Sequence, residues 1–303
     1  TVSTEPYIAE AKRGRHGLAS TPWGFDGKEL SLVVGGGAYD NIDTVTDHFT
    51  EKARMQACLR GKPSPLAAWR TPKIAKKIAS IAIRNGKRSG GVTAHTLREA
   101  AYQAVPECTS FKVSLAAEIN LLFDARVVLD PFSGWGDRAL GAAGALVSKY
   151  VGVDPNPALV EGYAKITEFL KTAAPFTEVK FRSIPFEAYG DAEFAADFGA
   201  TPPDLIFSSP PFYNYELYNP ADPHQSTRFK AQALWLSEWF LPTIDRAWAL
   251  LAPGGHLALY LTDARGEITT PLCRHMAAEP GRTFRGVIAC WRGRKRPLPL
   301  WVW

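Results

Sequence analysis

The stretch Val128-Leu129-Asp130-Pro131-Phe132-Ser133-Gly134-Trp135-Gly136-Asp137-Arg138 runs from a short apolar segment through an acid into a glycine-rich turn. Gly134 and Gly136 lack a Cβ, so the backbone of this turn can approach a ligand closely. In open α/β sheets, ligands bind outside the carboxyl ends of strands at turns of this kind. The turn lacks the GxGxxG spacing, and Asp130 and Asp137 favour a cationic or zwitterionic ligand over a pyrophosphate. The stretch therefore predicts a ligand site where a buried strand ends.

From about residue 107, short apolar runs alternate with segments of helical periodicity. The apolar runs occupy seven ranges: 126–130, 150–154, 179–182, 204–208, 256–261, 285–291 and 298–303. The helical segments between and before them include 110–123, 157–172 and 231–251. This alternation predicts an α/β fold with a doubly wound, mostly parallel seven-stranded sheet that helices cover on both faces. We expect the last two strands to form an antiparallel hairpin at one edge.

The first hundred residues follow a different pattern. One short strand is expected at 30–34, and Pro72 should begin or kink a helix. Helical periodicity covers three ranges: 44–60, 65–85 and 94–104. We therefore divide the chain into a mainly helical N-terminal appendage, residues 1–105, and an α/β domain, residues 106–303.

Composition narrows the classes of protein that this chain can be. It has 303 residues, of which 46% are hydrophobic and 21% charged, which excludes a wholly disordered protein. No run of about 18 apolar residues indicates a membrane span, and the first residues do not resemble a secretory signal. The histidines show no HExxH spacing, so we expect no metal site. The cysteines lie far apart, which predicts reduced thiols and a cytoplasmic protein: Cys58, Cys108, Cys273 and Cys290.

Basic residues gather toward both ends of the chain. Residues 51–100 hold 12 lysines and arginines against two acids, and residues 282–303 hold six basic residues and no acid. This distribution favours contact with a nucleic acid at the periphery, although a solvated basic surface would give the same counts. The candidate phosphate contacts are Lys73, Lys76, Lys77, Arg84, Lys87, Arg88, Arg292, Arg294, Lys295 and Arg296.

A second apolar run ends in Asp154, twenty residues after Gly134. A carboxylate at the tip of this strand can accept hydrogen bonds from both hydroxyls of a ribose. The alternative is a helix N-cap before Pro155 and Pro157. The combination of Asp154 with the glycine turn favours ribose binding over a helix cap.

The fourth apolar run ends in Ser208-Ser209-Pro210-Pro211-Phe212. Two prolines stop a strand and stiffen the turn that follows it. Such a turn would hold a hydroxyl, a backbone carbonyl and an aromatic face around one pocket at the carboxyl edge of the sheet.

These motifs resemble those of class I S-adenosylmethionine-dependent methyltransferases, and among them the amino-methyltransferases that modify N4 of cytosine or N6 of adenine in DNA. The resemblance covers residues 106–303 and implies S-adenosylmethionine as the cofactor. Compact enzymes of this kind occur in restriction systems and phages. The residues that carry the resemblance are Asp130-Pro131-Phe132-x-Gly134-x-Gly136, the tetrad Ser209-Pro210-Pro211-Phe212, and Phe111-Lys112-x-x-Leu115-Ala116.

The resemblance also implies roles for individual residues. Contacts to the cofactor are expected from Phe111, Lys112, Asp130, Phe132, Gly134, Gly136, Asp154, Ser183 and Ser208. The tetrad Ser209, Pro210, Pro211 and Phe212 would hold the target base. The Ser209 hydroxyl and the Pro210 carbonyl would accept the amine hydrogens, and Phe212 would stack on a flipped or single-stranded base. In the loop that follows, Tyr213, Tyr215 and Tyr218, with His224 and Arg228 beyond them, would close over that base as a lid; the alternative is an ordinary loop.

The substrate implied is DNA, with alternatives. A tetrad that begins with serine favours N4 of cytosine over N6 of adenine, and the absence of a Pro-Cys dipeptide counts against methylation at C5. Few residues follow Phe212 beyond those in the last strands, so the basic N-terminal region would have to contribute target recognition. RNA or a protein amide are the alternative substrates. A non-catalytic nucleic-acid-binding or assembly subunit is the alternative to an enzyme.

Overall fold

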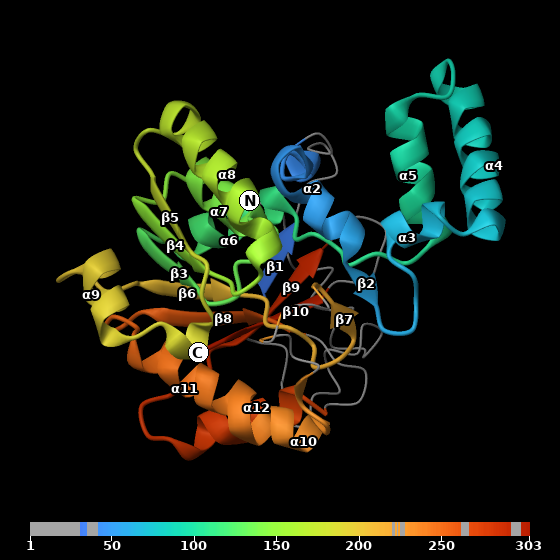
Figure 1. Cartoon of the computed structure of the whole chain (residues 1–303). Coiled ribbons are helices and arrows are strands. Elements are labelled where there is room, and N and C mark those ends of the chain that lie inside the picture. The colour runs from blue at the N-terminus through green and yellow to red at the C-terminus, as the bar shows by residue number, and fades with distance from the viewer. Residues whose placement is uncertain are drawn as a thin grey trace.

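A computed structural model describes residues 31–34, 42–219, 222, 224, 228–261, 267–291 and 298–303. Its centre is one sheet of eight strands in the order β1-β9-β10-β8-β6-β3-β4-β5 (Figure 1). Only β10 is antiparallel to its neighbours among these strands. The strands are β1 Ser31–Val34, β3 Val127–Asp130, β4 Lys149–Val153, β5 Glu178–Arg182, β6 Leu205–Ser208, β8 His256–Tyr260, β9 Gly286–Trp291 and β10 Leu298–Val302.

The doubly wound, mostly parallel sheet of seven strands is thus confirmed, and β1 adds an eighth strand. β1 pairs in parallel with β9, in the register Leu32 to Ala289. The antiparallel pairing of β9 with β10 is also confirmed, but its expected place at the edge is wrong. β10 inserts between β8 and β9, and β1 covers the outer side of β9.

Helices cover both faces of the sheet (Figure 1). The helices of the α/β part are α6 Val113–Leu122, α7 Asp137–Gly144, α8 Val160–Ala173, α9 Asp191–Phe198, α10 Gln232–Trp235, α11 Leu241–Ala249 and α12 Thr269–Ala278. The sequence patterns did not indicate α9 or α12. Single turns of other helix types occur at η3 Pro157–Leu159 and η4 Phe186–Ala188, and a π-helical turn, η6 Leu236–Phe240, joins α10 to α11.

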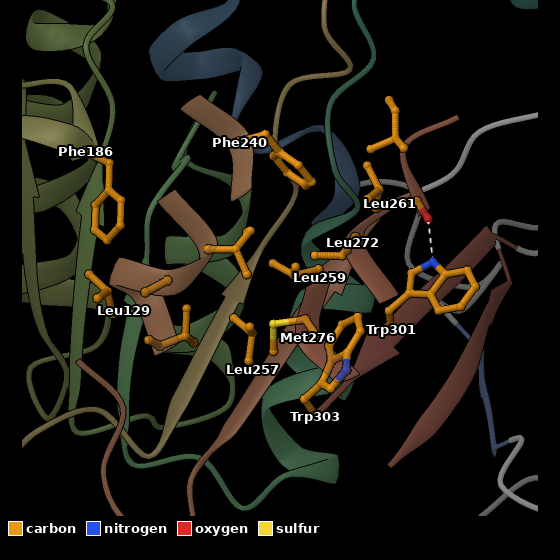
Figure 2. Packing of buried hydrophobic residues seen from close by; sticks show 14 of the residues in the cluster. Leu129, Phe186, Phe240, Leu257, Leu259, Leu261, Leu272, Met276, Trp301 and Trp303 are labelled. Atoms are coloured by element: carbon orange, nitrogen blue, oxygen red, sulfur yellow. Dashed lines mark hydrogen bonds between the residues drawn. The ribbon is translucent and has the colours of Figure 1, made fainter. Parts of the chain in front are cut away.

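Along each central strand, alternate residues pack into two different hydrophobic cores, one on each face of the sheet. In β3, Val128 packs beneath α6 and α7, whereas Leu129 packs toward α11 and α12. Figure 2 shows the second core, in which Leu257 and Leu259 of β8 lie near Met276 of α12. Because side chains alternate between the faces of a strand, burial on both faces requires the continuous apolar runs seen in the sequence.

The N-terminal helices form two groups: α2 Asp47–Gln56, which packs on the sheet domain, and a helical arm of α3 Pro65–Trp69, α4 Pro72–Ser89 and α5 Ala94–Ala104. The α2 helix is anchored where the Thr50 hydroxyl donates to the Trp135 carbonyl at 2.9 Å. The helical arm has its own small core, including Ile78 and Ala101, and stands away from the sheet (Figure 1). The division at residue 105 stays a prediction.

Local sequence signals explain how the helical arm is built. Pro72 begins α4, as expected, because a missing amide hydrogen is tolerated in the first turn of a helix. Gly90 ends it with a φ of 84°, a conformation that glycine adopts without strain. Thr93 then caps α5, and its hydroxyl accepts from the Thr96 amide at 3.2 Å. In the described part of the chain, no helix is both long and apolar enough to cross a bilayer.

Candidate active site

A cavity of about 300 Å³ opens where β3, β4 and β6 end at the same edge of the sheet. This volume is at the lower end of the range for sites that bind small molecules. It brings together eight of the residues that the sequence singled out: Phe111, Phe132, Gly134, Asp154, Ser209, Pro211, Phe212 and Tyr215. The glycine turn, the second strand tip and the tetrad therefore share one space.

Asp130 lies directly beneath this cavity and is fully buried. Its carboxylate accepts from Arg138 Nε at 2.7 Å, from the Tyr150 hydroxyl at 2.6 Å and from the Ser208 hydroxyl at 2.5 Å. Burial lowers the pKa of Arg138, but Asp130, Tyr150 and Asp137 together outweigh this effect, so the pKa lies above its ordinary value. Asp130 and Ser208, which we expected to contact a cofactor, do not line the cavity and instead join the strand ends under it.

The two glycines of the turn serve different purposes. Gly134, at a φ of 57°, lines the cavity, and its amide donates to Asp154 Oδ2 at 2.9 Å. Gly136, at a φ of 94°, does not line it. A Cβ on Gly136 would lie 2.6 Å from Cδ1 of Ile166 in α8, so this buried side chain would have to shift to admit it. The expected ligand contact at Gly136 is not found in this geometry.

Asp154 projects from the tip of β4 into the cavity. Its Oδ1 accepts from the Asn156 amide at 2.9 Å, while the Asn156 side chain caps the following η3 turn. Burial raises the pKa of Asp154 to about 7; the backbone amides of Asn156 and Gly134 oppose this rise, and the carboxylates of Asp130 and Asp222 add to it. The carboxyl therefore changes charge near neutral pH.

The tetrad follows β6 immediately. Ser209, Pro211 and Phe212 line the cavity, whereas Pro210 is buried and does not. Within the described part of the chain, the Ser209 hydroxyl has no hydrogen-bond partner, so it can interact with a ligand. Phe212 packs against the core that α11 and α12 cover.

The loop after the tetrad is tied to the N-terminal region. Two short strands, β2 Cys58–Leu59 and β7 Glu216–Leu217, pair antiparallel. The Arg60 amide donates to the Tyr215 carbonyl at 2.9 Å, and the Asn219 amide group donates to Asn156 Oδ1 at 3.0 Å. The loop in which we expected a lid is therefore fastened on two sides.

Several expected contacts lie elsewhere. Lys112 Nζ forms an ion pair with Asp43 at 2.9 Å, and Ser183 is exposed outside the cavity. The Tyr213 hydroxyl donates to the Phe229 carbonyl at 3.1 Å, and this residue does not line the cavity. Arg292, Arg294, Lys295 and Arg296 lie outside the described residues, as does the side chain of Arg88.

The basic residues of α4 lie outside the cavity, on the helical arm. Lys73, Lys76, Arg84 and Lys87 are exposed to solvent. Lys77 is also exposed, but its Nζ donates to the Ala104 carbonyl at 2.8 Å and so caps the end of α5. Lys77 therefore has a structural role in the helical arm, whatever else it contacts.

The structure adds lining residues that sequence patterns missed. Burial raises the pKa of Asp137 to about 6 and also raises the pKa of Glu216. Asp137 and Arg138 both belong to the glycine-turn stretch, and of the two only Asp137 was expected to influence the ligand. The others lie in loops or helices without a motif. The missed residues include Trp135, Arg138, Glu187, Glu216, Asp222, Trp239 and Tyr260. Among the described residues, no three His, Cys, Asp or Glu side chains are grouped to hold a metal ion.

We predict that Gly136→Ala lowers the free energy of unfolding by roughly 2–5 kcal/mol, because it combines a left-handed backbone with a clash against α8. Gly134→Ala is the matched control, since it has the same backbone handedness but no side-chain or backbone atom nearer than 3.8 Å to its new Cβ. It should cost roughly 1–2 kcal/mol. Urea denaturation measures both, and equal losses would contradict the packing role of Gly136.

Comparisons with known proteins give distant structural likenesses only. No family model matches the chain, and no curated protein matches it. Similar solved structures include the ribosomal protein L11 methylase from Lactobacillus delbrueckii subsp. bulgaricus (14% identity, 65% of this chain and 80% of that chain, TM-score 0.39). A methyltransferase from Geobacter sulfurreducens has 14% identity over 72% of this chain and 94% of that chain, with a TM-score of 0.38.

A third similar structure is the SAM-dependent methyltransferase from Agrobacterium tumefaciens, with 16% identity over 66% of this chain and 64% of that chain and a TM-score of 0.39. Likenesses at these levels carry no argument about function.

Proposed function

We propose that this protein transfers a methyl group from S-adenosylmethionine to an exocyclic amino group of a nucleic-acid base in DNA, at N4 of cytosine in first place and at N6 of adenine in second. One observation carries the proposal: the Gly134 turn, Asp154 and three residues of the tetrad, Ser209, Pro211 and Phe212, come from separate strand ends and line one cavity.

The lining suits the proposed cofactor. Asp154, once ionised, offers acceptors for the two ribose hydroxyls, and Gly134 leaves room for the thioether chain beside it. Aromatic rings, among them Phe186 and Trp239, provide flat apolar surfaces for an adenine and a base. Acidic side chains outnumber basic ones in this wall, which favours a sulfonium. When bound, the cofactor would supply an electrophilic methyl group.

The tetrad would make the amine reactive. An exocyclic amine delocalises its lone pair into the ring and is a weak nucleophile. The Ser209 hydroxyl and the Pro210 carbonyl accept the amine hydrogens in this proposal, which directs the lone pair toward the methyl group. Phe212 holds the ring by stacking, and the methylated nitrogen releases one proton to solvent.

The exposed basic residues of α4 would bind the phosphates of the substrate. Their charge is available because no acid lies in α4 to neutralise Lys73, Lys76 or Arg84. The helical arm also joins the site through its C-terminal connection, since Thr109 and Phe111, a few residues after α5, line the cavity.

The main test incubates the protein and S-adenosylmethionine with duplex DNA, single-stranded DNA, RNA and a protein mixture, followed by mass spectrometry of nucleosides and peptides. We expect N4-methylcytosine from DNA. Ser209→Ala and Phe212→Ala should each lower turnover roughly tenfold to a thousandfold while cofactor affinity stays within about twofold. Full turnover in both variants would show that the tetrad is not the active site, and methylation of RNA or protein alone would change the substrate.

Cofactor affinity should depend on the charge of Asp154. We expect the affinity for S-adenosylhomocysteine to rise between pH 6 and pH 8, because the Asp154 carboxyl, with its pKa of about 7, must lose its proton before it can accept both ribose hydroxyls. The loss below the pKa approaches about tenfold per pH unit. Calorimetry measures the affinity at each pH. Asp154→Asn is the matched control, because the ligand itself still titrates in experiments with this variant. The variant should bind weakly and without this rise; the same rise in both proteins would contradict the role of Asp154.

Reversing the charge of Lys73, Lys76 and Arg84 should weaken binding of DNA and reduce the slope of log affinity against log salt by about three. Lys77 is left unchanged because it caps α5. A matched control reverses three exposed charges far from the helical arm, Arg126, Lys165 and Lys171. Fluorescence anisotropy over a salt series measures both, and equal slopes in the two variants would make α4 an ordinary surface.

A further inference from the structure

We propose that Arg138 is an anion-binding residue of the cavity that holds the carboxylate of the cofactor's α-amino acid part. This inference rests on the proposed function. The resemblance implies cofactor contacts from Phe111, Lys112, Asp130 and the glycine turn, and it implies no role for Arg138.

The geometry of the guanidinium supports this assignment. Arg138 is only 5% exposed, yet it lines the cavity. Its Nε and Nη2 donate to the two Asp130 oxygens at 2.7 and 3.3 Å, and Nη2 also donates to the Phe132 carbonyl. Nη1 takes part in none of these bonds and has no partner in the described part of the chain. Its donors are therefore free for a ligand.

The guanidinium is also held in place. Both carboxylate oxygens of Asp130 accept hydrogen bonds from the guanidinium, and the guanidinium carbon Cζ lies 5.6 Å from the centre of the Phe111 ring. A planar guanidinium fixed by a carboxylate on one side presents its remaining donors in a defined direction. Little side-chain entropy would be lost when an anion binds there.

Electrostatics makes Arg138 the residue that such an anion requires. The other ionisable side chains of the wall are mostly acids, and Arg138 is the one permanently charged cation among the described lining residues. Lys112 cannot replace it in this geometry because its ammonium group is paired with Asp43. A ligand carboxylate in this cavity would be repelled at most positions and attracted at Arg138. The acids of the wall are Asp137, Asp154, Glu187, Glu216 and Asp222.

The test compares two ligands that differ in the carboxylate. S-adenosylhomocysteine carries the whole amino acid part, and 5′-methylthioadenosine carries the adenosine and sulfur without it. In Arg138→Gln, we expect the affinity for S-adenosylhomocysteine to fall roughly tenfold to a hundredfold, the effect of losing one charged hydrogen bond, while the affinity for methylthioadenosine stays within about twofold. Calorimetry on the full chain measures both.

Arg138→Lys is the matched control, because it keeps a positive charge beside Asp130. It should retain part of the preference for S-adenosylhomocysteine. If Arg138→Gln does not fold, the double variant D130N/R138Q, which removes both buried charges together, replaces it and should show the same selective loss. Equal losses for the two ligands would overturn this inference alone. A wild-type protein that binds neither ligand would overturn the proposed function and this inference with it.

Discussion

The cavity depends on one buried carboxylate. Asp130 is fully buried, and a charge in that position costs several kcal/mol unless hydrogen bonds and an opposite charge compensate it. Compensation comes from Arg138 of α7, Tyr150 of β4 and Ser208 of β6. Each donor belongs to a different element, so the requirement to satisfy one carboxylate fixes the relative positions of the elements that surround the cavity.

The residues that face the cavity are chain neighbours of those that hold Asp130. Ser209 follows Ser208 directly, and the Ser208 hydroxyl also accepts from the Phe132 amide at 3.1 Å, so the glycine turn and the tetrad share a support. The Gly134 amide in turn binds the Asp154 carboxylate. A side chain one residue from a fully bonded anchor has little freedom to shift, which is the condition for precise placement of reacting groups.

Local patterns predicted the strands of the sheet and several of the residues that line the cavity. The strands β3, β4 and β6 are mainly apolar runs because they are buried on both faces, and Asp154 and Ser209 lie in the cavity because the ends of parallel strands meet at one edge. The uses of Asp130 and Gly136 could not be predicted, since both depend on contacts with distant residues. The ion pair of Lys112 could not be predicted either, because its partner Asp43 lies 69 positions earlier in the chain.

The cavity wall and the helical arm are parts of one connected structure. The chain enters the arm through β2, which pairs with β7 in the loop after the tetrad, and it leaves the arm through residues that lead to Thr109 and Phe111 in the wall. The joint itself is polar: Arg54 of α2 binds Glu107, and the Tyr102 hydroxyl of α5 donates to Glu51 at 2.9 Å. A nucleic acid held on α4 would therefore act on both chain connections of the arm. The second connection supplies Thr109 and Phe111 to the wall, and the first pairs with β7, whose Glu216 lines it, so the proposed docking on α4 would bear on the shape of the cavity.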